Sequence, residues 1–199
     1  PRAKGSPLAW DGRSAKAARH CRRRIEGEGG HGLRDGRAVT GAEDGLAIAR
    51  RRIAAEAEAR SGTLDLAHLG LTELPKELFE LRHLRALRLG SMTHRRDKRN
   101  RLAGKLGVLT RLDALEEVSL AFLDLETLDE LAPLRRLRVL TVSGNPIADL
   151  APLAGLANLQ HLACGDTPVA DLAPLAGLAN LQHLACEGTQ VRDLAPLAG

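Results

Sequence analysis

"DLAPLAGLANLQHLAC" occurs twice in the chain, at residues 149–164 and again at residues 171–186. The complete 22-residue windows around them, 147–168 and 169–190, are identical at 18 of 22 positions. The interval continues upstream, since an apolar residue recurs every 22 residues at Val118, Leu140, Leu162 and Leu184. A repeat of fixed length predicts a stack of similar units, each burying its apolar face against its neighbours.

The segment LRVLTVSGNPI (137–147) shows the order of residues within one unit. Its apolar and polar positions follow the pattern L-x-x-L-x-L-x-x-N-x-L, with Leu137, Leu140, Val142, Asn145 and Ile147 at the specified places. The alternating part predicts a short strand, because neighbouring side chains in a strand point to opposite faces. Pro152 and Pro174 interrupt the return segments, which favours short 3-10 or irregular turns over long helices.

The period places six strands along the chain. We expect them at 63–67, 86–90, 117–121, 139–143, 161–165 and 183–187. The interval from Leu87 to Val118 is 31 residues, which is one period plus nine. The additional length coincides with HRRDKRNR (94–101), where we expect a basic surface loop.

These repeats resemble the leucine-rich repeat family over residues 61–199. More narrowly, residues 50–81 and the later copies resemble bacterial intracellular proteins of this family, including the Roco type, in which such repeats precede a GTPase domain. The resemblance implies an α/β solenoid with parallel strands on the concave face, short convex returns and protein recognition on the concave face. The chain has no G-x-x-x-x-G-K-[ST] phosphate loop, so we assign no nucleotide chemistry to it.

Three regions are predicted. Residues 1–42 mix Gly, Arg, Ala and Ser with few periodic apolar residues, which is typical of a disordered basic leader. Residues 43–60 carry apolar side chains at helical spacing and predict a helix that caps the first repeat. Residues 61–199 form the solenoid, and VRDLAPLAG (191–199) opens a further copy, so we expect a truncation within a repeat.

Composition restricts the class of protein. Three Cys are too few for a disulfide scaffold and favour a reducing compartment, so we expect a cytoplasmic protein. No apolar run reaches about 18 residues, which predicts no membrane span. The chain carries 29 Lys/Arg and 25 Asp/Glu, and its excess of basic residues lies within the first 60 residues.

His161, Cys164, His183 and Cys186 have the residue types of a zinc site. However, residues three apart in a strand point to opposite faces, so His161 and Cys164 should not bind one ion. We therefore expect neither a metal nor a cofactor. Cys164 and Cys186 are expected to be small core residues and not a redox pair. Thr167 and Thr189 stand at the turn position that Asn145 fills in an earlier repeat, where we expect their hydroxyls to bond local backbone groups.

His161 and His183 should lie side by side on the concave face, where three interpretations stay open. They could contact a partner, form a weak two-ligand metal patch, or reflect only the duplication of the repeat. The basic loop lacks interleaved aromatic residues, so we do not expect nucleic acid to bind at His94, Arg95, Arg96, Lys98, Arg99 and Arg101.

No catalytic motif stands out, which favours a non-catalytic module that binds a protein partner. The alternative is the N-terminal regulatory fragment of a multidomain bacterial signalling enzyme such as a Roco-type GTPase. We assign no oligomeric state. The predicted partner-binding residues, all on the concave face, are Arg88, Glu117, Ser119, Val139, Thr141, Ser143, His161, Ala163, His183 and Glu187.

Overall fold

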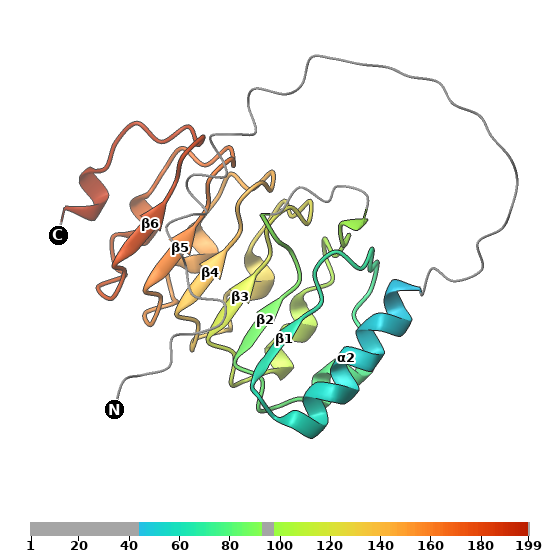
Figure 1. Ribbon diagram of the computed structural model, residues 1–199. Coiled ribbons are helices and arrows are strands. Elements are labelled where there is room, and N and C mark those ends of the chain that lie inside the picture. Colours follow the sequence, from blue (N-terminus) through green and yellow to red (C-terminus); the bar gives the residue numbers. More distant parts are fainter. Residues whose placement is uncertain (1–43, 93–97, 199) are drawn as a thin grey trace, which may run out of the picture.

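The computed structural model describes residues 44–92 and 98–198, which form a curved stack of repeats behind an N-terminal helix (Figure 1). The helix is α2 (Gly45–Ala59). The strands are β1 (Thr63–Asp65), β2 (Ala86–Arg88), β3 (Glu117–Ser119), β4 (Val139–Thr141), β5 (His161–Ala163) and β6 (His183–Ala185). The 3-10 turns are η2 (Lys76–Glu80), η4 (Gly107–Arg111), η5 (Asp129–Leu131), η6 (Ala151–Leu153), η7 (Ala173–Leu175) and η8 (Ala195–Leu197).

The six strands form one parallel sheet in sequence order, which confirms the predicted solenoid. The central residues of the strands are paired in register, from Leu64 through Leu87, Val118, Leu140 and Leu162 to Leu184. Each strand begins at its predicted residue but has three residues instead of five. The ladder continues for one further hydrogen bond, such as Val142 N to Ala163 O at 2.8 Å, before the chain turns.

The core is aliphatic and continuous along the stack. Nearly every repeat position predicted to be apolar is buried, and the cluster consists mainly of Leu with a few Val, Ile, Ala and one Cys. Burying one Leu side chain stabilises the fold by about 1.5–3 kcal/mol. Since these side chains pack between successive repeats, each repeat depends on its neighbours for stability.

The convex returns are 3-10 turns, as the prolines predict. Pro lies at the first or second position of η6, η7 and η8, where a missing N–H costs no hydrogen bond. An aspartate precedes each of these turns and accepts a backbone hydrogen bond: Asp149 from Ala151 N, and Asp171 from Ala173 N. The last three returns, η6 to η8, therefore share this aspartate hydrogen bond, and Asp193 makes it before η8.

Helix α2 covers the first repeat and begins two residues later than predicted. The Asp44 side chain accepts a hydrogen bond from Leu46 N and caps the helix, which therefore starts at Gly45. Ala49 and Ile53 are buried against the repeats. The predicted leader, 1–42, lies outside the described residues, and no helix in the described part of the chain is long and apolar enough to cross a membrane.

The buried side chain of Asn145 joins two successive repeats. Asn145 donates to Leu120 O and Val142 O, and its side-chain oxygen accepts from backbone N–H groups of the preceding repeat. Thr167 and Thr189 occupy the equivalent position in the last two repeats, where their hydroxyls donate to the carbonyls of Cys164 and Cys186 at 2.6 and 2.7 Å. These threonines thus have the local structural role that the sequence predicts.

The predicted basic loop, 94–101, needs a correction at its end. Asn100 is buried, and its amide donates to Leu66 O and Leu89 O while its oxygen accepts from Leu71 N at 2.9 Å. Asn100 therefore fills the asparagine position of its repeat, displaced by the inserted residues. Lys98 and Arg101 are exposed, whereas 93–97, including the predicted residues at 94–96, lie outside the described residues.

Candidate functional site

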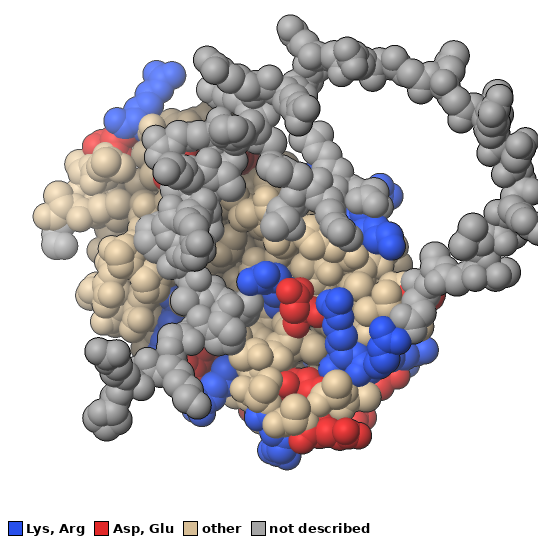
Figure 2. Space-filling model, viewed as in Figure 1, with Lys and Arg blue, Asp and Glu red and all other residues tan. Residues whose placement is uncertain are grey.

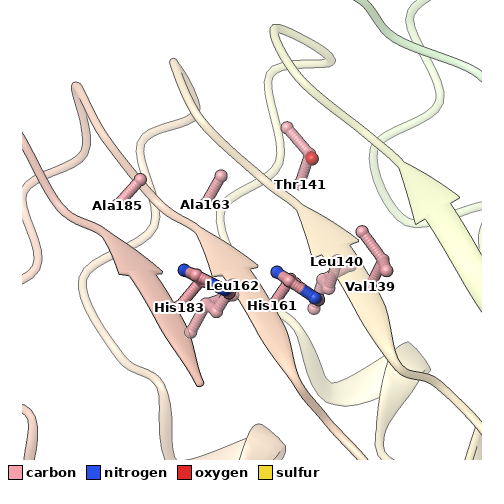
Figure 3. A pocket seen from close by; sticks show the side chains of 8 residues that line it. All are labelled: Val139, Leu140, Thr141, His161, Leu162, Ala163, His183 and Ala185. Atoms are coloured by element: carbon pink, nitrogen blue, oxygen red, sulfur yellow. The ribbon is translucent and has the colours of Figure 1, made fainter. Parts of the chain in front are cut away.

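One face of the sheet points away from the leucine core, on the side opposite the 3-10 turns, and is called the outward face. It presents two rows of side chains, one from the first and one from the third residue of each strand. The first row includes Glu117, Val139, His161 and His183, and the second includes Ser119, Thr141, Ala163 and Ala185. Figure 3 shows the two imidazoles lying parallel, with Val139 beside His161 and with Ala163 and Ala185 further along the same strands. Together with Leu140 and Leu162 below, these residues line a shallow hollow across β4, β5 and β6.

His161 and His183 stack, with ring centroids 4.6 Å apart and ring planes 8° from parallel. The Nδ1 atom of His161 is buried and has no hydrogen-bond partner among the described residues. Burial lowers the pKa of His161, the neighbouring His183 lowers it further, and Glu117 raises it in part. His161 is therefore mainly neutral at pH 7, and one of its ring nitrogens can accept a hydrogen bond while the other donates.

Cys164 lies in the core and Cys186 is partly buried against it, both on the face opposite the histidines. The pKa of Cys164 is raised to about 12, mainly by burial and in part by the neighbouring Cys186. Burial also raises the pKa of Cys186, with a smaller contribution from Glu187. Both residues are free thiols, and neither has the lowered pKa of a reactive cysteine.

His161 and Cys164 lie on opposite faces of the strand, as the alternation predicts. Within residues 44–92 and 98–198, no group of three or more His, Cys, Asp or Glu side chains is arranged to hold a metal ion.

Most predicted face residues lie on the outward side. His183 and Glu187 are exposed, and the half-buried residues are Arg88, Glu117, Ser119, Val139, Thr141, His161 and Ala163. Arg88 forms an ion pair with Asp65 at 3.5 Å, and the Ser119 hydroxyl donates to Gly90 O. These two side chains are therefore partly engaged within the protein.

The placement of Ser143 on the exposed face is wrong. Ser143 is 2% exposed, and its carbonyl accepts a hydrogen bond from Phe122 N at 3.0 Å. The chain has left the strand direction after Thr141, and the Phe122 ring of the preceding repeat lies against the adjacent Gly144. Alternation along a strand does not apply to a residue beyond its end.

Sequence reasoning missed Asp65 and Ala185, which share the second outward row. The 22-residue period leads from Ala163 to Ala185, and Asp65 is the third residue of the first predicted strand, so the sequence contained a signal for both. The visible face also differs in charge along its length: Lys, Arg, Asp and Glu side chains gather toward the α2 end, and the β5–β6 end is mostly uncharged (Figure 2). The histidine hollow thus lies in the less charged half.

No model of a known protein family matches the chain, and no curated protein matches it either. In structure, the chain is similar to internalin C2 of Listeria monocytogenes, at 26% identity and a TM-score of 0.56 over 77% of this chain and 78% of that one. It is also similar to a leucine-rich repeat protein of Leptospira interrogans, at 23% identity and a TM-score of 0.53.

The second match covers 63% of this chain but only 31% of the Leptospira protein, so it shows the fold alone. The narrower resemblance to the Roco type stays a prediction. The 22-residue period, the parallel sheet in sequence order and the likeness to these solved structures show that the chain is a leucine-rich repeat protein.

Proposed function

We propose that the chain is a protein-interaction module that binds its partner on the outward sheet face, centred on the hollow beside His161 and His183. One observation carries this assignment: the buried Nδ1 of His161 has no hydrogen-bond partner among the described residues, and His161 lines the shallow hollow. A buried polar atom left unsatisfied costs about 1–3 kcal/mol. A partner group that hydrogen-bonds there would recover part of this cost.

The hollow is small, so it favours contact by a single polar group of a partner over insertion of a whole side chain. Ala163 and Ala185 leave space beside the two rings, and the strands beneath are held in register by backbone hydrogen bonds. A rigid receptor loses little conformational entropy on binding, which leaves more of the contact energy for affinity. The histidine rings supply flat apolar surface together with polar edges, a combination common in interface anchors.

We further propose that the module is non-catalytic and cytoplasmic. Within the described part of the chain, the two thiols are unpaired and have raised pKa values, which supports a structural role for them in a reducing compartment. Most of the side chains around the histidine hollow are Ala, Val and Leu, which carry no nucleophilic group.

The proposal is tested by affinity capture followed by a binding measurement with the identified partner. Ala163→Arg fills the hollow with a long cation, whereas Ala176→Arg, on the exposed convex side, is the matched control. Partner affinity should fall at least about tenfold for Ala163→Arg and stay unchanged for Ala176→Arg. Grouped replacement of Thr141, His161 and His183 by Ala that left the affinity unchanged would overturn the proposal.

A further inference from the structure

A second hollow lies on the convex side, between η2 and η4. It is an open groove with about 1060 Å³ of space including its mouth. Its apolar residues are Leu74, Phe79 and Val108, and its charged residues are Glu73, Lys76, Lys105 and Arg111. The groove is separated from the histidine hollow by the leucine core, since strands and 3-10 turns lie on opposite sides of each repeat.

The groove occurs where the repeat is irregular. Turns η2 and η4 have five residues each, whereas η6, η7 and η8 have three residues of Ala, Pro and Leu. The repeat between β2 and β3 also contains the inserted residues, so its return does not copy the return before it. The groove is thus lined by longer turns with larger side chains than the Ala-Pro-Leu turns carry.

The cations are positioned over the apolar floor. The Arg111 guanidinium lies 5.7 Å from the centre of the Phe79 ring, and the Lys105 ammonium donates to the Thr72 carbonyl. Lys76 is exposed at the first position of η2. None of these three cations forms an ion pair with a carboxylate of the described residues, and the nearby Glu77 is paired with Arg50 at 3.2 Å.

We propose that this groove is a second docking surface, which binds an acidic peptide segment of another protein through an aliphatic or aromatic anchor. The anchor would pack on Leu74, Phe79 and Val108, while carboxylates on either side would pair with the cations at the mouth. Charge complementarity selects this occupant, because three cations face one lining carboxylate.

The chain's own leader has the wrong charge for this groove. Residues 1–42 contain ten Lys/Arg and four Asp/Glu, so they would bring like charge to Lys76, Lys105 and Arg111. With the histidine hollow on the opposite side, occupation of both surfaces would let the solenoid hold two segments at once. The groove proposal does not depend on the function proposed for the sheet face.

The test uses the full chain and a fluorescein-labelled octapeptide of alternating Glu and Leu, with an otherwise identical Lys-Leu peptide as control. Fluorescence anisotropy should show saturable binding of the acidic peptide, with a dissociation constant on the order of 100 µM, as befits a small exposed site. Raising NaCl from ~0.05 to ~0.5 M should weaken binding, because solvent-exposed ion pairs are screened.

The double variant Lys76→Glu with Arg111→Glu should weaken acidic-peptide binding about tenfold, since attraction becomes repulsion. Arg136→Glu with Arg192→Glu makes the same change in net charge at exposed positions outside the groove and should leave binding unchanged. Melting temperatures of both variants check the fold, and Lys76→Gln with Arg111→Gln should give an intermediate loss.

Three results would overturn the proposal: no saturable binding of the acidic peptide, equal binding of the Lys-Leu peptide, or equal loss in both charge-reversal variants. Self-association in analytical ultracentrifugation that the groove variant abolishes would instead assign the groove to a second copy of this chain. Ala163→Arg should leave acidic-peptide binding unchanged, so that failure at the sheet face and failure at the groove give different results.

Discussion

His161 and His183 stack at 4.6 Å because their strands pair in register, so that duplication of one sequence places identical rings one strand spacing apart. The stack has an electrostatic consequence: a proton on one ring disfavours a proton on the other. Burial and this repulsion together keep the pKa of His161 below its ordinary value.

Stability should therefore fall as the pH is lowered below about 6.5, the ordinary pKa of histidine. In that range the unfolded chain binds a proton that the folded chain resists, and the loss levels off once the pH is below the folded pKa. His161→Phe keeps an aromatic ring but cannot titrate. Urea unfolding between pH 7.5 and pH 5 should show a shallower dependence for this variant, and an identical dependence would contradict the assignment.

Glu56 should stabilise the junction between α2 and the first repeat. Burial raises its pKa, but hydrogen bonds from Ser61, Gly62 N and His83 outweigh burial and leave the pKa below its ordinary 4.5. This stabilisation is present above pH 4.5 and is lost as the pH falls through the lowered pKa. Glu56→Gln should lower the free energy of unfolding at pH 7 by about 1–3 kcal/mol.

Glu58→Gln is the control for Glu56→Gln, because Glu58 is an exposed residue of the same helix. It should change the free energy of unfolding by less than about 0.5 kcal/mol. Comparable losses in the two variants would mean that charge on α2, and not the buried hydrogen bonds of Glu56, stabilises the junction.

Asn100 should contribute strongly to the stability of the fold, although the sequence around it is a basic stretch. Asn100→Ala leaves Leu66 O, Leu89 O and Leu71 N without their side-chain partner, and should cost roughly 3 kcal/mol or more. Asn158→Ala removes a single exposed hydrogen bond to Arg135 O and should cost below about 1 kcal/mol. Chemical denaturation of both variants distinguishes a structural asparagine from a solvated loop residue.

Cys164 and Cys186 should differ in their rates of alkylation. In a chain carrying Cys21→Ser, iodoacetamide at pH 8 should label Cys186 first, since Cys164 is buried and has a pKa of about 12. About one Cys164 thiol in ten thousand is ionised at that pH. Both should react rapidly in urea, and prompt labelling of native Cys164 would contradict a closed core at this position.

Much of the fold follows from the sequence because, in a repeat protein, residues one period apart in the chain are also neighbours in space. The 22-residue period fixes which residues of neighbouring strands meet, as Leu140 and Leu162 do, and alternation then divides core from surface. Prolines such as Pro152 exclude long return helices. The opposite placement of His161 and Cys164 follows from the same alternation.

Features that depend on contacts between unlike repeats were visible only in the tertiary structure. Ser143 is buried because the chain turns after β4 and Phe122 of another repeat packs beside it, and Asn100 is buried because the insertion rejoins the register there. The groove at Phe79 and Arg111 lies between two returns whose turns are longer than those of the later repeats and differ from each other in sequence. The repeated sequence thus determined the strands, their register and the core, whereas irregular positions were settled by packing, which a period cannot specify.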